Sequence, residues 1–446
     1  CINLHAYAYT HLRNKQKVFI FASIIFITFC VIFYGFRFIY YYRKFNKKTE
    51  SGETLQLLSS KIRSDNEEAK AGDGLYSIGN EFIFKGKSVN NYVMYSGLLW
   101  RIVKINNDGS INLVTDKIIN EFMWGTEDSN YKTSQIRKWL NKSDDNTGIF
   151  YSNLYNPNDY LKTTLICLNT VSSLSSFKCD DTLNDDYVGL LSTIDYTNSI
   201  VDEETYLNIN DEYWLLTMSQ DNTAWFVDSK NLSKSSILDS YGIRPTITLN
   251  STVYYETGDG ILENPYKIGY NEGLSLGSFV KLGNDNWIVY EVNNDSIRLS
   301  LASYYNNGNS SYRFGDSNNF SVTSTSSLAY FLNNNFYESL SYKDLIITSD
   351  WYIGEYNDDF TNIYKDKVSA KVGLYNIADI KLNNDTKNYY LMTKGSSGKI
   401  FGFDMSGYLF ESATTQNRYI KPAITIKKNK IISGSGTVND PYILEA

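Results

Sequence analysis

The chain has 446 residues, a net charge of −7 and an apolar content of 42%, which leaves room for two or three domains with their own cores. Its two histidines, His5 and His11, both lie near the N-terminus. Histidine-based proton transfer, Ser-His or Cys-His catalysis and histidine metal ligation are therefore excluded for the rest of the chain. The part after residue 70 is acidic, which argues against nucleic acid as a partner because phosphates need a basic surface.

An uncharged segment rich in Ile, Phe and Val runs from Val18 to Phe36. A helix of this length spans the hydrocarbon core of a bilayer at about 1.5 Å per residue. Tyrosines follow the segment, as is typical of a membrane interface, so we expect a transmembrane helix within residues 18–42. A buried core helix would normally have a polar face, and a cleaved signal peptide would end in a small-x-small site. The segment has neither feature.

We expect residues 1–17 to be cytoplasmic and the domains after the helix to be extracellular, because long domains are translocated largely regardless of flanking charge. The positive-inside count taken alone slightly favours the reverse, since more Lys and Arg follow the segment than precede it. Residues 43–72 are polar and predict a stalk that is partly helical around residues 55–62. The sequence thus predicts a single-pass protein of the cell membrane, which contacts the bilayer through residues 18–42.

Behind the stalk the sequence repeats itself, and the spacing between matched motifs drifts as it does when connecting loops change length. The paired motifs begin at Trp100 and Trp287, Thr133 and Thr325, and Gly258 and Gly434. A repeat of this length indicates a duplicated domain rather than a solenoid unit. We therefore expect a first domain over residues 73–270, which opens at Gly74, and a second over 271–446, which opens at Gly273.

Each repeat begins with a hairpin and a short helix. In the first, alternating strands at 100–105 and 111–114 flank an Asn-Asn-Asp-Gly turn, which is a strong hairpin signal. The helix that follows has a Ser N-cap and an apolar stripe at i, i+3 and i+4. Cap and stripe are Ser134 with Ile136, Trp139 and Leu140 in the first repeat, and Ser326 with Leu328, Phe331 and Leu332 in the second.

Strands complete each repeat. Val-Gly-Leu occurs at 188–190 and 372–374, and apolar runs follow at 213–217 and 389–393. The closing runs, 243–249 and 420–426, alternate as half-buried strands do, and their prolines indicate a sheet edge or a strand entry. Gly-x-Gly before Pro-Tyr then predicts a domain-closing turn, with Tyr266 and Tyr442 packing back against it.

The order of these motifs resembles a domain of unknown function that is widespread in surface proteins of low-GC Gram-positive bacteria. The matching residues of the first repeat are Trp100-Arg101, Ser134, Arg137, Trp139-Leu140-Asn141 and Gly242-Ile243-Arg244-Pro245. The second repeat departs from the pattern, with no Arg after Trp287, Ala329 in place of Arg137 and Lys421 in place of Arg244. The resemblance implies two tandem α+β domains with the C-type-lectin-like fold of formylglycine-generating enzymes, rich in antiparallel strands. Its motifs are structural and imply no chemistry.

Cys167 and Cys179 lie twelve residues apart in a loop-like stretch. A short-loop disulfide between them would suit an oxidising exterior, but two independent thiols fit the spacing as well. The second repeat contains no cysteine, so any bridge belongs to the first repeat alone.

Motifs for catalysis or metal binding are weak. Ser175-Ser-Phe-Lys178 has the S-x-x-K pattern of penicillin-binding enzymes but lacks partner motifs, so we interpret it as a polar loop. Acidic clusters occur at 180–181, 185–186 and 202–204. They predict solvated loops, with a carboxylate pair for glycoside hydrolysis as the alternative. We expect no metal or other cofactor: calcium would find oxygen ligands in these loops, but no calcium-binding motif supports it.

Aromatic residues suggest where a binding surface could lie. Trp124, Trp225 and Trp351 neighbour Gly, Asn and Asp, so we expect them on exposed loops that contact a ligand. We therefore predict a membrane-anchored surface protein without catalytic activity, whose partner is an extracellular glycan, wall polymer or protein. The alternative is a wall-active, glycosidase-like hydrolase that uses an acidic pair in the first domain, and a third interpretation is a purely structural surface component.

Overall fold

The computed structural model describes residues 56–141, 148–171, 173, 179–268, 273–357, 360–382, 386–404 and 409–445. The chain divides into two units, residues 1–56 and residues 57–446. Segment 1–17, the predicted transmembrane helix at 18–42 and the first part of the predicted stalk lie outside the described residues. Within the described residues, no helix combines the length and apolar character that crossing a bilayer requires.

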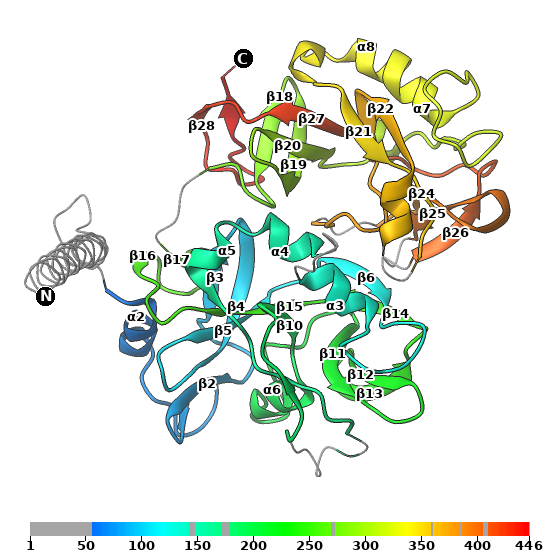
Figure 1. The fold of residues 1–446 in the computed structure, drawn as a ribbon. Coiled ribbons are helices and arrows are strands. Elements are labelled where there is room, and N and C mark those ends of the chain that lie inside the picture. Colours follow the sequence, from blue (N-terminus) through cyan, green and yellow to red (C-terminus); the bar gives the residue numbers. More distant parts are fainter. Residues whose placement is uncertain are drawn as a thin grey trace, which may run out of the picture. The chain divides into compact units, whose positions relative to one another are not determined.

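The described part of residues 57–446 consists mostly of β-strands in several sheets, with short helices between them (Figure 1). This confirms the expected strand-rich α+β class. For convenience, residues 57–268 are called the first half and residues 273–445 the second half.

The largest sheet belongs to the first half and follows the order β10-β15-β5-β4-β3-β17-β16, while β2 joins β4, β1 joins β2, and β7 joins β15. Its strands are β1 (Gly74–Ile78), β2 (Glu81–Lys85), β3 (Tyr92–Tyr95), β4 (Leu98–Ile105), β5 (Ile111–Thr115), β7 (Leu161–Lys162), β10 (Val188–Leu190), β15 (Pro245–Leu249), β16 (Tyr255–Thr257) and β17 (Tyr266–Ile268). The predicted hairpin is confirmed as β4–β5, and Pro245 is the first residue of its strand, where its missing N–H is tolerated.

A second sheet of the first half has the order β13-β12-β11-β14-β6, and β8 and β9 form a separate pair. These strands are β6 (Asn120–Met123), β8 (Ile166–Cys167), β9 (Thr182–Leu183), β11 (Tyr213–Met218), β12 (Thr223–Asp228), β13 (Asn231–Ser236) and β14 (Ser240–Ile243). The helices of this half are α2 (Leu58–Asp65), α3 (Gln135–Leu140), α4 (Ile149–Asn153), α5 (Pro157–Tyr160) and α6 (Thr193–Asn198).

The second half contains a five-stranded sheet in the order β18-β19-β20-β27-β23 and a three-stranded sheet, β24-β25-β26. Its strands are β18 (Phe279–Leu282), β19 (Asp285–Val292), β20 (Ser296–Leu301), β21 (Ser349–Tyr352), β22 (Lys367–Ala370), β23 (Val372–Gly373), β24 (Tyr389–Lys394), β25 (Lys399–Phe403), β26 (Leu409–Ala413), β27 (Ala423–Lys427), β28 (Ile431–Ser433) and β29 (Ile443–Leu444). Its helical segments are η2 (Tyr305–Gly308), α7 (Leu328–Phe331), η3 (Leu332–Phe336), α8 (Tyr337–Ser339), η4 (Lys343–Leu345), η5 (Thr361–Lys365) and η6 (Ser396–Gly398).

The central strands of the two halves follow the same order. The run β10-β15-β5-β4-β3 of the first half corresponds to β23-β27-β20-β19-β18 of the second, and β11-β12-β13 corresponds to β24-β25-β26. The opening segments differ, because Gly74 begins the β1–β2 hairpin whereas the segment after Gly273 leads directly into β18, the counterpart of β3.

An asparagine holds the Val-Gly-Leu strand in both halves. The Asn141 side chain donates to the Val188 carbonyl (2.8 Å) and accepts from the Val188 amide (2.9 Å). Asn333 makes the same two hydrogen bonds with Val372, both at 2.9 Å. A buried backbone group without a partner costs free energy. In each half the asparagine side chain therefore provides the hydrogen-bond partners for the valine amide and carbonyl.

The closing turns also match. A Cβ atom at Gly258 would lie 2.1 Å from the carbonyl oxygen of the proline before Tyr266, and one at Gly434 would lie 2.2 Å from the corresponding oxygen before Tyr442. Both glycines have positive φ angles, +100° and +92°, which a residue with a Cβ rarely adopts. Each tyrosine ring lies against the second glycine of its turn, which confirms the predicted packing.

Helix α3, the predicted helix of the first repeat, is capped as expected, since the Ser134 side chain accepts a hydrogen bond from the Arg137 amide at its start. In the second half the prediction is wrong by one residue: Ser327, not Ser326, accepts from the Ala329 amide at the start of α7. Two neighbouring serines make the cap position ambiguous from sequence.

The predicted polar stalk is wrong for its last part. Helix α2 lies within residues 43–72, yet Leu58 and Ile62 are both 0% exposed and belong to the hydrophobic core. The Leu58 amide donates to the Val253 carbonyl, and the Tyr266 hydroxyl donates to Asp65. Leu58 and Ile62 lie four residues apart and therefore on one face of α2, and this face packs into the core. The compact part thus begins at residue 57.

Candidate functional site

The three tryptophans predicted for a binding surface lie in the interior instead. Trp124 and Trp351 are 0% exposed and Trp225 is 7% exposed. Each indole N–H donates to a backbone carbonyl, at 3.2, 2.9 and 3.0 Å for Trp124, Trp225 and Trp351 respectively. The expectation of exposed aromatic contacts is therefore wrong: Trp225 and Trp351 lie within strands β12 and β21, Trp124 directly follows β6, and all three rings belong to the hydrophobic core.

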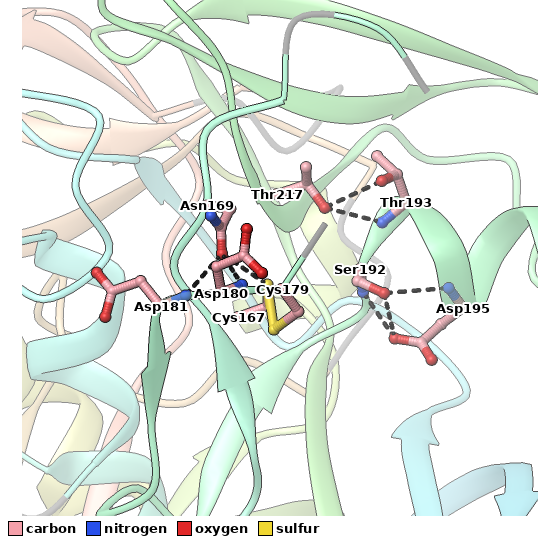
Figure 2. The surroundings of a disulfide bond; sticks show 9 residues. All are labelled: Cys167, Asn169, Cys179, Asp180, Asp181, Ser192, Thr193, Asp195 and Thr217. Atoms are coloured by element: carbon pink, nitrogen blue, oxygen red, sulfur yellow. Dashed lines mark hydrogen bonds between the residues drawn. A yellow bond between two sulfur atoms is a disulfide. The ribbon is translucent and has the colours of Figure 1, made fainter. Parts of the chain in front are cut away.

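Cys167 and Cys179 form a disulfide with a Cα–Cα separation of 5.4 Å (Figure 2). The Asn169 side chain accepts hydrogen bonds from the backbone amides of Asp180 and Asp181, at 2.9 and 3.0 Å. The disulfide and the Asn169 side chain together fix residues 179–181 beside β8. The S-x-x-K motif, Ser175 to Lys178, lies outside the described residues.

The acidic clusters are either exposed or paired. Asp186 forms a bidentate ion pair with Arg137, with N–O distances of 2.8 and 3.0 Å. Glu204 lies 3.5 and 3.6 Å from the ammonium groups of Lys87 and Lys230. Within the described part of the chain, no group of three or more His, Cys, Asp or Glu side chains could hold a metal ion. The carboxylates of these clusters are thus solvent-exposed or paired with cations in the structure.

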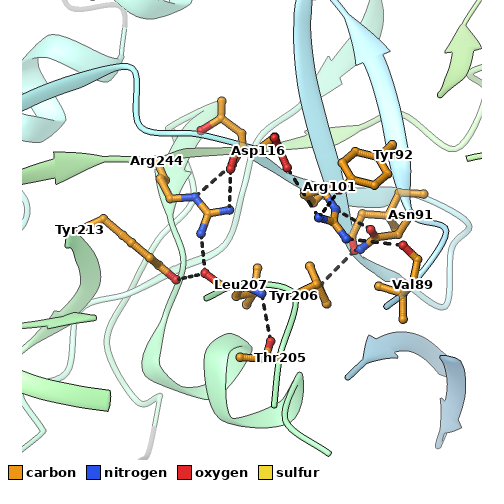
Figure 3. A network of polar contacts seen from close by, with 12 residues as sticks. Val89, Asn91, Tyr92, Arg101, Asp116, Thr205, Tyr206, Leu207, Tyr213 and Arg244 are labelled. Atoms are coloured by element: carbon orange, nitrogen blue, oxygen red, sulfur yellow. Dashed lines mark hydrogen bonds and ion pairs between the residues drawn. The ribbon is translucent and has the colours of Figure 1, made fainter. Parts of the chain in front are cut away.

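Two of the three arginines named by the family resemblance, Arg101 and Arg244, lie in the interior of the first half (Figure 3). Arg244, 1% exposed, donates to the carbonyls of Thr115 and Leu207 at 3.1 and 2.9 Å. Arg101 donates to Asn91 and stacks on the Tyr92 ring, 3.8 Å from its centroid. Burial lowers the pKa of Arg101, an effect that Tyr92 and Asp116 oppose. These groups are fully engaged with the protein and leave little for a ligand.

Two further carboxyl groups, Glu121 and Asp379, are buried, with exposed fractions of 5% and 8%. Burial raises the pKa of Glu121 to about 8, and the positive charge of Lys381 opposes the shift. Burial also raises the pKa of Asp379 to about 7; Glu291 adds to this, while the Asn376 amide, Arg298 and Lys381 oppose it. The Oε1 atom of Glu121 has no hydrogen-bond partner among the described residues. Both groups are thus partly protonated acids at neutral pH.

A surface pocket of about 270 Å³ lies where α2 meets the turn between β1 and β2 and the turn of the β4–β5 hairpin. We call it the α2 pocket. Its lining residues are Ser59, Arg63, Gly79, Asn80, Phe82, Ile105, Asn106, Asn107 and Gly109.

The floor and rim of the α2 pocket differ in chemistry. Ile105 is buried and Phe82 half-buried, and they give an apolar floor. The Arg63 guanidinium lies over the Phe82 ring, 4.2 Å from its centroid. Asn80 and Asn107 are exposed at the rim, and no acceptor or donor for their side-chain amides occurs within the described residues. The pocket therefore offers an apolar surface surrounded by hydrogen-bonding groups, the usual make-up of a site for a polar small ligand.

The hairpin turn lies close to the helix. Gly109 has a φ of +80°, and a Cβ atom built on it would lie 3.5 Å from the Ser59 hydroxyl. Asn106, in the same turn, donates to Ser110 and Asn112 at 2.9 and 2.7 Å, which fixes the turn internally. One wall of the pocket is thus a rigid turn and the other is a helix held by its buried face.

Reasoning from sequence identified the hairpin turn but missed the pocket. Arg63 fell inside the predicted stalk, and nothing in the sequence places it over Phe82. The spacing of Leu58 and Ile62 was the available signal, since it indicates a helix with a face to bury. Comparison with protein-family models, curated proteins and solved structures finds no match for this chain.

Proposed function

We propose that this chain is a binding protein without catalytic activity, and that the α2 pocket takes a polar extracellular ligand, a saccharide unit of a glycan or wall polymer. The observation that carries the proposal is the lining of the pocket. Three asparagines, a serine and an arginine surround Phe82 and Ile105, and no carboxylate is among them. Glycoside hydrolysis normally needs two carboxyl groups that face one bond, whereas amides around an aromatic ring suit recognition.

We further propose that the two halves are tandem copies of one domain with C-type-lectin-like character. The shared strand order, the Asn141 and Asn333 contacts and the matched glycine turns support this proposal. An anchor at residues 18–42 would place both copies outside the cell. The disulfide in the first copy is in keeping with an oxidising exterior.

A hydrolase remains the second candidate because of Glu121. A carboxylic acid with a raised pKa is what a general acid needs, and Asp211, Glu212 and Asp404 lie near enough to raise it further. Glu121 does not line the α2 pocket. Glycan turnover by the full chain that is lost in Glu121→Gln would favour this candidate over binding alone.

The test is a glycan array probed with the full chain and two matched variants. Asn107→Ala removes a rim amide of the pocket, and Asn294→Ala removes the asparagine at the equivalent place in the β19–β20 turn of the second half. We expect Asn107→Ala to weaken saccharide binding about tenfold, the usual cost of one good hydrogen bond, and Asn294→Ala to leave it unchanged. Equal effects of both variants, or no saccharide binding at all, would contradict the proposal.

A further inference from the structure

We infer that the α2 pocket selects a saccharide that carries an anionic group, a carboxylate or a phosphate, and that Arg63 binds this group. The inference rests on the proposed function of the pocket and adds the class of ligand. It follows from the charges around the pocket, the position of Arg63 and the free donors at the rim.

Arg63 is the one charged residue in the lining of the pocket. The acidic residues of the surrounding elements have cationic partners of their own. Asp65 pairs with Lys61 at 2.7 Å, Glu81 with Lys104 at 3.2 Å, and Asp108 with Lys162 at 2.7 Å. Glu67, which follows α2, is exposed and does not line the pocket. The pocket therefore has an uncompensated positive charge, although the chain as a whole is acidic.

Arg63 is held in place without an ion pair. The buried side chains of Leu58 and Ile62 fix α2, and the guanidinium rests on Phe82 at 4.2 Å from the ring centroid. No carboxylate lies within ion-pair distance of Arg63 among the described residues. A guanidinium on an aromatic face keeps its N–H donors available, and their planar arrangement matches the oxygens of a carboxylate or phosphate.

The uncharged groups at the rim of the pocket also favour a ligand with an anionic group. Asn80 and Asn107 present amide donors, and Ser59 of α2 adds a hydroxyl to the lining. Donors of this kind bind anion oxygens as well as sugar hydroxyls. A volume of about 270 Å³ is just below the range of roughly 300–1,000 Å³ for drug-sized ligands, so it suits one charged sugar unit. A cationic sugar would find no carboxylate in this lining.

The experiment measures affinities of the full chain for glucose, glucuronate and glucose 6-phosphate by titration calorimetry at low and high salt. We expect at least one of the two acids to bind ten times or more tightly than glucose, and this advantage to fall with salt because it is electrostatic. Arg63→Gln should abolish the advantage of the two acids over glucose, while Arg63→Lys should keep part of it. Arg313→Gln, which removes an exposed arginine of the second half, should change nothing.

The outcomes separate the two proposals. Equal affinity for glucose and both acids, with a loss in Asn107→Ala, would overturn the anionic class and leave saccharide binding intact. Absence of binding by all three sugars would overturn the inference, and absence of binding on the glycan array as well would overturn the proposed function. Binding of anionic phospholipid vesicles without any sugar binding would also overturn the inference, since the ligand would then be a membrane surface. Circular dichroism and a thermal melt confirm that Arg63→Gln remains folded.

Discussion

The two halves of this protein share the order of their central strands and differ in the elements around these strands. The shared residues satisfy buried backbone groups: Asn141 and Asn333 hold one strand each, and Thr217 and Thr393 accept an amide hydrogen bond at 2.9 Å at equivalent turns. Helix α2 and the β1–β2 hairpin have no counterpart among the described residues of the second half. The comparison teaches that the repeated residues build the fold, while the candidate site combines a repeated hairpin, β4–β5, with α2 and the β1–β2 hairpin, which are described only in the first half.

The replacement of Arg244 by Lys421 at the equivalent position shows how far the shared fold tolerates change. Arg244 lies over the Tyr213 ring at 4.7 Å, and Lys421 lies over the corresponding Tyr389 ring at 5.8 Å. Both cations are buried, at 1% and 2% exposed. A stacked positive charge is kept, whereas the bonds of Arg244 to backbone carbonyls depend on the guanidinium. Arg244 and Lys421 thus occupy equivalent positions in the fold but carry different cationic groups.

The largest expected effect comes from the buried tryptophans, one in each half. Trp124→Ala and Trp351→Ala should each lower the free energy of unfolding by about 4 kcal/mol, because each empties a fully buried indole site. Urea denaturation measures this loss. Leu238→Ala, at a position 57% exposed, should change stability by less than about 0.5 kcal/mol. A small stability loss in either tryptophan variant, combined with lost ligand binding, would restore the idea of a surface site.

A smaller effect distinguishes the two Val-Gly-Leu strands. A Cβ atom at Gly373 would lie 2.3 Å from the Trp351 ring, whereas one at Gly189 would lie 3.2 Å from the Thr246 hydroxyl. We expect Gly373→Ala to cost about 3 kcal/mol through overpacking and Gly189→Ala about 1 kcal/mol or less. Thermal or urea melts of the two variants give the comparison directly. Similar costs would mean that the second half can move Trp351 aside.

The smallest effect depends on pH and on Asp379. Its pKa is raised to about 7 by burial, so between about pH 4 and 7 the folded state keeps a proton that the unfolded state has lost. Stability must then fall as the pH rises through this window. We expect Asp379→Asn to remove about 2 kcal/mol of the decline between pH 5 and pH 8.

The matched control for Asp379 is Asp195→Asn. Asp195 accepts the amide of Ser192 at 2.9 Å, and Asp379 accepts the equivalent amide of Asn376 at 2.7 Å, but Asp195 is half-exposed. Urea melts at both pH values compare the wild type with the two variants. If Asp195→Asn removed the same part of the decline, burial of Asp379 would not be its cause.

Local patterns in the sequence predicted local structure well. The Asn-Asn-Asp-Gly turn predicted the β4–β5 hairpin, Ser134 predicted the cap of α3, and Gly258 predicted a closing turn. In each case the physical cause lies within a few residues: a positive φ, a hydroxyl that accepts an amide, or an alternation of side chains. Matching these signals across the repeat also indicated which elements correspond.

The candidate site could not be predicted in this way. Arg63 and Phe82 belong to different elements, and their stacking depends on how α2 packs against the sheet. Tryptophans next to Gly and Asn resemble exposed loop residues in sequence, yet Trp124 and Trp351 are completely buried. Burial of a ring is decided by tertiary packing, which neighbouring residues along the chain do not report.

The docking of α2 links ligand occupancy to the N-terminal end of the compact part of the chain. A ligand that contacts both Arg63 and Asn107 would bridge the helix and the hairpin turn. Thermodynamic reciprocity then requires that occupancy strengthen the attachment of α2, and that detachment of α2 expel the ligand. Because α2 forms one wall of the α2 pocket and lies at the start of residues 57–446, loosening of this end of the compact part would open that wall.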